Sequence, residues 1–151
     1  MPSLNRVGND GAPLPRIAGG SGLRDDPISP LACTVRSLDG AMCLSVSGDL
    51  DLASVPLLLG HLNRAAEGTA NVIIDLSGLR YIDSSGINTL LAAGKIFARK
   101  GHQIVLAAAS PMMLRLLRII NLEQAMPIFP TVEAALAGLR DGESSGSGRA
   151  G

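Results

Sequence analysis

The sequence predicts a single α/β domain with a mixed, mostly parallel sheet of about five strands and about four helices. The first observation behind this is a hairpin signal, because two runs of strand-forming residues flank Asp39-Gly40. The second is that short apolar runs then alternate with segments of helical spacing, which is typical of parallel strands joined by helices. The third is the length of 151 residues, which suits one domain.

The N-terminal hairpin is predicted from "CTVRSL" and "AMCLSVSGDL". With Asp39-Gly40 as a two-residue turn, residues whose numbers sum to 79 face each other, so Cys33 pairs with Val46 and Arg36 with Cys43. One face then carries Cys33, Val35, Met42, Leu44 and Val46, and the other carries Thr34, Arg36, Cys43, Ser45 and Ser47. This predicts a ribbon with its apolar face on a core and its largely polar face outward.

The first two helices are predicted on either side of a buried strand. Ser54 is expected to cap a helix that has Pro56 in its first turn. Val72–Ile74 forms a continuous apolar strand, and a second helix is expected from about Ser84 to Lys100. The inward side chains are predicted to be Leu58, Leu59, Leu62 and Ala65 or Ala66 in the first helix, and Ile87, Leu90, Leu91 and Phe97 in the second.

The remaining elements follow the same alternation. "HQIVLAAA" is predicted to be another buried strand, and Ser110-Pro111 to open a third helix. "MPIF" is predicted as a short fifth strand, and Thr131 as the cap of a last short helix. In the third helix the expected inward residues are Met113, Leu116, Leu117 and Ile120; in the last, Val132, Ala135 and Leu136.

The two ends of the chain have a different composition. Residues 1–29 and 141–151 are rich in Gly, Pro, Ser and other polar residues, which bury too little apolar surface to offset ordering. We therefore expect disordered tails at 1–29 and 141–151, and one folded domain at 30–140.

Composition excludes several function classes. The chain has no Trp, one Tyr and two Phe, which argues against an aromatic platform for single-stranded nucleic acid. Its 13 basic and 13 acidic residues balance, so it lacks a global electrostatic footprint for DNA or an anionic membrane. No apolar run has the length of a membrane span, and no basic-then-apolar segment marks a secretory signal. The expected compartment is the cytoplasm.

The stretch "YIDSSGINTLL" at 81–91 is the candidate functional motif, because two hydroxyls stand where a strand turns into a helix. A helix cap is one interpretation, since Asp, Ser and Gly are common at such junctions. A nucleophilic serine is another, but the sequence lacks G-x-S-x-G, and neither His61 nor His102 is placed as a base. A small hydrolase using Ser84 stays a rival hypothesis. A phosphorylation site is the third interpretation.

Sites for small cofactors are not indicated. The phosphate-binding motif G-x-x-x-x-G-K-[ST] is missing, and no His, Cys, Asp or Glu grouping has metal-ligand spacing. The acidic residues Asp49, Asp51, Asp75 and Asp83 are interpreted as loop ends and caps. The sequence thus predicts no catalytic residue, no bound cofactor and no metal.

Three segments carry a family resemblance: "SGDLDLASV", "VIIDLSGLRYIDSSGINTLL" and "SPMMLRLLRIINL". Together with the element order they resemble a STAS domain, and more narrowly the bacterial anti-sigma factor antagonists, over about 32–139. Two positions depart from the family pattern. In "GDLD" Asp49 stands where the family has Glu, and Asn88 stands where many antagonists have a second glycine.

The resemblance implies a STAS-like fold and a non-enzymatic, partner-switching regulator of transcription. Ser84 resembles the serine that a cognate anti-sigma factor with serine kinase activity phosphorylates. The unphosphorylated antagonist binds that kinase and frees the sigma factor, and a serine phosphatase restores the binding form. The expected partner-binding residues are Asp49, Asp51, Asp83, Ser85, Gly86 and Asn88.

A second surface is indicated by helical spacing, because Met112, Arg115 and Ile119 lie off the buried stripe of the third helix. Met112 and Arg115 are therefore added to the predicted partner-binding residues. The alternative function is a STAS subunit of a transporter or stress-sensing complex that acts as a protein-interaction module. Direct binding of nucleic acid or membrane is not expected.

Overall fold

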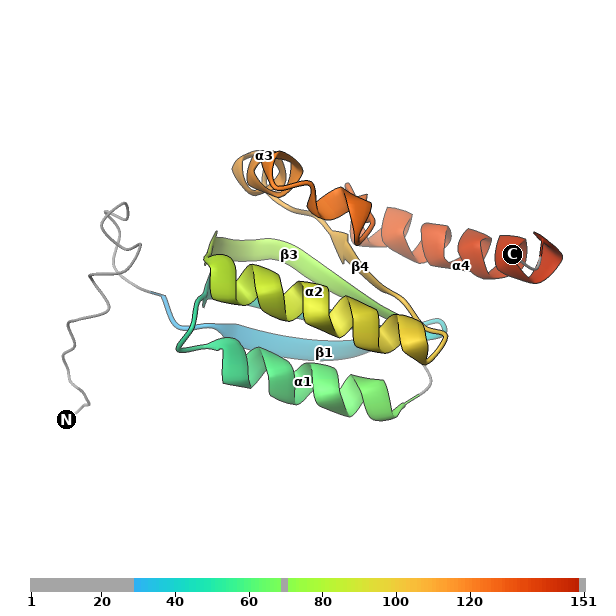
Figure 1. Cartoon of the computed structure of the whole chain (residues 1–151), viewed down its shortest axis with the longest axis horizontal. Helices are drawn as coiled ribbons and strands as arrows, with labels where there is room; N and C mark the ends of the chain where they lie inside the picture. Colours follow the sequence, from blue (N-terminus) through green and yellow to red (C-terminus); the bar gives the residue numbers. More distant parts are fainter. Residues whose placement is uncertain (1–28, 69–70, 150–151) are drawn as a thin grey trace.

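The computed structural model describes residues 29–68 and 71–149, with side chains through residue 141. It contains five strands and four α-helices, which confirms the predicted architecture (Figure 1). In chain order the elements are β1 (Ala32–Leu38), β2 (Ala41–Leu50), α1 (Val55–Glu67), β3 (Asn71–Ile82), α2 (Ser84–Arg99), β4 (Ile104–Ala107), α3 (Pro111–Ile119), the short 3-10 helix η3 (Leu122–Gln124), β5 (Ile128–Phe129) and α4 (Val132–Arg149). Apart from Ser29, the predicted tail 1–29 lies outside the described residues.

The sheet has the order β1-β2-β3-β4-β5. β1 is antiparallel to β2, and all later neighbours are parallel. The hairpin pairs Cys33 with Val46 and Arg36 with Cys43, as the Asp39-Gly40 turn predicts. Asp39 and Gly40 both have positive φ, the conformation that lets a two-residue turn follow the twist of the strands.

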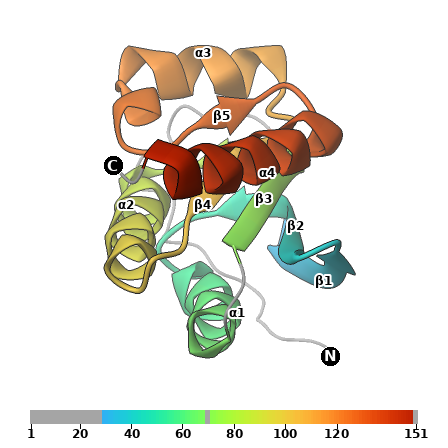
Figure 2. The ribbon, with the colours of Figure 1, turned by 90° about the vertical axis from the view of Figure 1, so that its right-hand side faces the viewer.

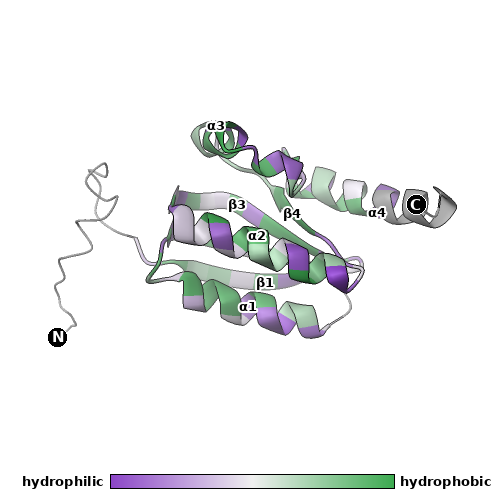
Figure 3. Ribbon diagram, viewed as in Figure 1, coloured by the Kyte–Doolittle hydropathy of each residue, from purple (hydrophilic) through white to green (hydrophobic). Residues whose placement is uncertain are grey.

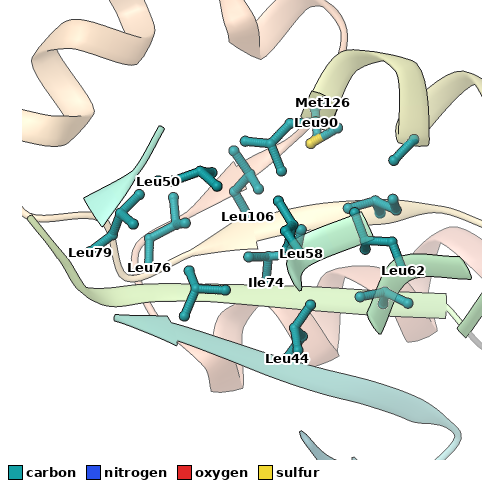
Figure 4. Packing of buried hydrophobic residues seen from close by; sticks show 14 of the residues in the cluster. Leu44, Leu50, Leu58, Leu62, Ile74, Leu76, Leu79, Leu90, Leu106 and Met126 are labelled. Atoms are coloured by element: carbon teal, nitrogen blue, oxygen red, sulfur yellow. The ribbon is translucent and has the colours of Figure 1, made fainter. Parts of the chain in front are cut away.

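The helices cover the two faces of the sheet unequally. Helices α1, α2 and α3 contribute Leu58, Leu90 and Leu117 to one large core, which also includes Leu44 of β2 and Ile74 of β3. Successive parallel strands are added in one direction here, so right-handed crossovers place these helices on the same face. Figure 2 shows α1 and α2 side by side, and Figure 4 shows Leu58 next to Ile74, with Leu62 further along α1.

A smaller core lies on the opposite face, under α4. It joins Ile73 of β3 and Val105 of β4 to Ala135 and Leu139 of α4. Because successive residues of a strand point to opposite faces, Ile73 and Ile74 belong to different cores. The strands in the middle of the sheet are covered on both sides, which explains their continuous apolar runs.

The prediction for the two faces of the hairpin is partly wrong. Val35 on the expected core face is 48% exposed, whereas Cys43 on the expected outer face is fully buried. The reason is the strand order. β1 is the sheet edge and extends beyond the core, while β2 lies inside the sheet between β1 and β3.

Three predicted inward side chains are also exposed: Leu59 of α1, Leu116 of α3, and Ile120, which follows α3. In α3 only Met113 and Leu117 are buried. Because α3 connects β4 to the two-residue strand β5 at the sheet margin, a narrow i, i+4 stripe is all that reaches the core.

The last helix is longer than expected. α4 has 18 residues and continues to Arg149, so the backbone of 141–149 is helical where the sequence predicts a disordered tail. Helix propagation adds a backbone hydrogen bond per residue, so a helix can continue beyond the side chains that anchor it; among the residues with described side chains, Leu139 is the last buried one.

Candidate functional site

The candidate site lies at the carboxyl edge of the parallel strands. β2 and β3 end together at this edge, where Leu50 pairs with Ile82, and α1 and α2 begin there. β4 ends earlier, at Ala107 opposite Asp75 of β3, and α3 follows it. Figure 1 shows α1 and α2 starting at the same end of the molecule. The backbone N–H of Asp83 donates to the carbonyl of Leu50 at 3.1 Å, which ties the start of α2 to the end of β2.

Asp83 caps α2. Its Oδ1 accepts hydrogen bonds from the backbone N–H groups of Ser85 at 2.9 Å and Gly86 at 3.1 Å. Its carbonyl accepts from the N–H of Ile87 at 3.0 Å, which closes the first turn. The cap interpretation of the Asp-Ser-Ser-Gly stretch is therefore confirmed for Asp83. The carboxylate also places a negative charge at the positive end of the helix dipole.

Ser84 is the first residue of α2, and its side chain is exposed. Its hydroxyl makes no hydrogen bond to any residue in the described part of the chain. Ser85 is half-buried in the same turn, and its carbonyl accepts from Thr89 Oγ1 at 2.8 Å. Of the two serines, Ser84 thus offers the hydroxyl that an outside enzyme can reach.

Gly86 is buried where α2 crosses the strand ends. A Cβ built on it would lie 2.7 Å from Leu50 Cγ and 2.9 Å from Ile82 Cγ1, closer than real Cβ contacts. The glycine therefore allows α2 to pack tightly on β2 and β3, and it presents no side chain to a partner.

Asp49 and Asp51 are 3% and 7% exposed, so neither offers its carboxylate to a partner in this structure. Asp49 Oδ2 accepts from the N–H of Ser29 at 2.9 Å, and Asp51 Oδ1 accepts from the N–H of Ser54 at 3.1 Å. The Ser54 hydroxyl donates to the carbonyl of Asp49 at 2.9 Å. These bonds hold the turn between β2 and α1.

Asn88, Met112 and Arg115 are exposed. Asn88 is one turn along α2 from Ser84, and the other two are on α3. Ser110 caps α3, because its Oγ accepts from the N–H of Met113 at 3.1 Å. The predicted site therefore divides into exposed residues (Ser84, Asn88, Met112 and Arg115) and residues that shape the edge from within (Asp49, Asp51 and Gly86), with Asp83 and Ser85 half-buried between them.

Leu52 is a surface residue that sequence reasoning missed. It is 72% exposed in the turn between β2 and α1, at the same edge as Ser84. The available signal was an apolar residue inside the polar turn "DLAS", where neither strand nor helix periodicity applies.

Neither histidine is placed as a general base for Ser84. His102 follows the carboxyl end of α2, and the 16 residues of that helix separate it from Ser84 by about 24 Å. His61 is in the middle of α1, with Nδ1 3.4 Å from Arg64. Within the described residues, no three His, Cys, Asp or Glu side chains form a group that could hold a metal.

These features define an α/β domain of STAS-like fold. At its exposed edge Asp83 caps α2, and Ser84 is the first residue of that helix. The chain belongs to the STAS domain family, whose model matches residues 32–135. Among the described residues, none of the helices combines the length and apolar character needed to span a membrane.

Individual relatives agree with this membership. The chain is 26% identical over 102 residues to an anti-sigma F factor antagonist of Paenibacillus polymyxa, covering 66% of this chain and 87% of that protein. A crystal structure of an anti-sigma factor antagonist from Mycobacterium paratuberculosis has a TM-score of 0.67 and 25% identity, covering 73% of this chain and 94% of that one. A sulfate transporter family protein from Wolinella succinogenes has a TM-score of 0.61 and 18% identity, covering 70% of this chain and 89% of that one. The last likeness shows the fold alone.

Proposed function

We propose that this protein is an anti-sigma factor antagonist that is switched by phosphorylation of Ser84. The observation that carries the proposal is the exposed hydroxyl of Ser84, the first residue of α2, which makes no hydrogen bond within the described residues. The relatives named as anti-sigma factor antagonists support it. In this role the protein is not itself an enzyme, and the chemistry on Ser84 belongs to its partners.

The cycle has two states. The unphosphorylated protein binds an anti-sigma factor with serine kinase activity, and the sigma factor is released. The bound kinase transfers a phosphoryl group to Ser84, which ends the binding. A serine phosphatase removes the group and restores the binding form. A change of about 1–3 kcal/mol in binding free energy, or roughly 5–150-fold in affinity, is typical of such coupling.

The Asp83 cap determines how phosphate acts. A phosphate at a helix start is expected to accept the free N–H groups of the first turn. Here Ser85 and Gly86 already donate theirs to Asp83 Oδ1, so those donors are occupied. The phosphate is therefore directed to solvent, where it adds about 1.5 to 2 negative charges beside the Asp83 carboxylate. The fold is left intact, and the penalty falls on a partner shaped for a neutral serine.

The binding surface in this proposal follows the exposed residues of the edge: Ser84 and Asn88 on α2, Leu52 in the neighbouring turn, and Met112 and Arg115 on α3. The buried Asp49, Asp51 and Gly86 act by positioning these elements. Half-buried Asp83 contributes its charge when Ser84 is phosphorylated.

A STAS subunit of a transporter or stress-sensing complex is the alternative function. The structural likeness to the Wolinella succinogenes protein favours it at the level of fold. In that role the edge binds a permanent partner. A negative charge at Ser84 is then not expected to abolish binding.

The test is capture from native lysate with three baits: the wild type, Ser84→Asp, and Ser37→Asp as a charge control on the exposed strand β1. We expect the wild type and Ser37→Asp to retain an ATP-binding serine kinase that Ser84→Asp loses. If all three baits retain the same transporter or scaffold subunits and no kinase, the proposed function is wrong.

A further inference from the structure

Helix α3 carries an apolar stripe that faces solvent. Met112 is 78% exposed and Ile119 is 71% exposed, and Leu116 between them is also exposed. Their spacing of i, i+4 and i+7 places all three on one side of the helix, with Arg115 beside them at i+3. The core takes a different stripe, Met113 and Leu117. α3 therefore has two apolar sides, and the described residues cover only one of them.

An open hollow of about 470 Å³ lies beside this stripe on α3 and shares Ile119 with it. It is lined by Pro111, Leu114, Arg115, Arg118 and Ile119. Figure 3 shows hydrophobic and hydrophilic residues together on this helix. The hollow thus combines apolar side chains with two guanidinium groups. A protein segment with apolar and acidic side chains would complement both.

The charge on α3 has one sign. Its sequence, "PMMLRLLRI", contains two arginines and no acidic residue. Arg115 forms no ion pair within the described part of the chain. Arg118 Nε lies 3.6 Å from Glu123 Oε2, but both side chains are largely exposed, so this pair is weak and can be exchanged. The two arginines are thus available to carboxylates of a partner.

A membrane is a poorer match than a protein. Segments that bind anionic lipid typically carry a cluster of 4–8 basic residues. Helix α3 has only two basic residues, Arg115 and Arg118. The whole chain has 13 basic and 13 acidic residues, so it carries no net positive charge.

We propose that the exposed side of α3 binds an acidic amphipathic helix of the partner. This inference rests on the proposed function and deepens it by naming the chemistry of the segment recognised. Both α2 and α3 follow the carboxyl ends of parallel strands, but β4 ends at Ala107, opposite Asp75, before β3 reaches Ile82. In this proposal one partner contacts both Ser84 and the hollow. The α3 contact is a second anchor that is independent of the phosphate on Ser84.

The direct test uses two synthetic helical peptides with the full-length protein. Each is about 15 residues long, the length at which isolated helices become stable in water. They share one leucine stripe, flanked by glutamates in the first peptide and by lysines in the second. We expect the acidic peptide alone to shift the backbone amide NMR signals of residues 112–120.

Charge reversal gives the matched comparison. The double variant Arg115→Glu, Arg118→Glu is expected to bind the acidic peptide at least about tenfold more weakly, because like charges then face each other. It should gain affinity for the lysine peptide. The control double variant Arg64→Glu, Arg99→Glu makes the same change of net charge on α1 and α2 and should bind like the wild type. Equal binding of both peptides, shifts outside α3, or α3 shifts caused instead by anionic phosphatidylserine vesicles would overturn the inference.

The purified anti-sigma factor separates this inference from the proposed function. The charge reversal on α3 should weaken binding of the anti-sigma factor to the protein with Ser84 intact, whereas the control reversal on α1 and α2 should leave that binding unchanged. If Ser84→Asp abolishes kinase capture while the reversal has no effect, the proposed function stands and the α3 inference fails. If the acidic peptide binds α3 but no kinase is captured, the α3 surface stands and the proposed function fails.

Discussion

Gly86 of α2 lies so close to Leu50 of β2 that a Cβ on the glycine would come within 2.7 Å of Leu50 Cγ. The same pair of elements is joined by the bond from the Asp83 N–H to the Leu50 carbonyl. The first turn of α2, which bears Ser84, is thus held against the end of a buried strand. The backbone that carries the Ser84 side chain is therefore fixed by packing, whereas the exposed hydroxyl itself is free to rotate.

Replacing Gly86 with alanine should lower the free energy of unfolding by about 1–3 kcal/mol, because the added methyl group overpacks the contact with Leu50 and Ile82. Urea unfolding measures this. Gly60→Ala in α1 is the matched control. Its Cβ meets no atom within 4 Å, so it should be neutral or stabilise by about 0.5–1 kcal/mol. Equal effects of the two substitutions would contradict the packing role of Gly86.

Removing the cap should also destabilise the protein. Asp83→Ala loses the bonds from the Ser85 and Gly86 N–H groups and should cost about 1 kcal/mol in urea unfolding. Asp83→Asn keeps an oxygen acceptor, and asparagine caps about as well as aspartate, so its stability should stay near that of the wild type. A loss as large for Asp83→Asn as for Asp83→Ala would show that charge, not the hydrogen bonds, stabilises this turn.

The exposures of the two serines predict the site of modification. Incubation with the captured kinase and ATP should add one phosphoryl group, and peptide mass spectrometry should locate it on Ser84. Ser84→Ala should abolish the modification, and Ser85→Ala should retain it because Ser85 is half-buried. Modification of Ser85 in the wild type would contradict the assignment.

The two thiols should differ in reactivity. Burial raises the pKa of the Cys33 thiol. Alkylation of Cys33 by iodoacetamide should therefore follow a pH profile displaced to higher pH than that of a free cysteine, since the thiolate is the nucleophile. As pH rises through the ordinary thiol range the unfolded chain ionises first, so any stability linked to this group is lost with rising pH.

Cys43 is fully buried and should react only when the chain unfolds. The variant Cys33→Ser leaves Cys43 as the single thiol, so labelling this variant without and with urea measures the reactivity of Cys43 alone. Rapid labelling of Cys43 in the folded protein would mean that the β1-β2 ribbon opens locally.

Much of the fold was predictable because its signals are local. The Asp39-Gly40 turn sets the register of the hairpin, so the pairing of Cys33 with Val46 followed from the sequence. The continuous apolar run at Val72–Ile74 indicated a strand covered on both faces, and the Asp83 and Ser110 caps marked where α2 and α3 begin. Each of these features depends on a few neighbouring residues.

Exposure depends on distant parts of the chain, and there the predictions were less accurate. Helical spacing alone cannot say which of two apolar stripes on α3 meets the core. Leu116 was predicted to face inward, but α3 lies at the sheet margin and buries only Met113 and Leu117. Val35 has the correct pairing partner, Leu44, yet it is exposed because β1 is an edge strand.

The sequence by itself determined the order of the elements, the hairpin register, and the position of Ser84 at a strand-to-helix junction, because capping, turn chemistry and hydrophobic period act over a few residues. The tertiary structure alone decided which acidic residues are available. Asp49 and Asp51 are buried, with carboxylates that accept from the N–H groups of Ser29 and Ser54. Asp83 instead accepts the N–H groups of Ser85 and Gly86, which are donors that a phosphate would otherwise use. It also decided that α3 presents its second apolar stripe to solvent, since that follows from where the crossover helix lies on the sheet.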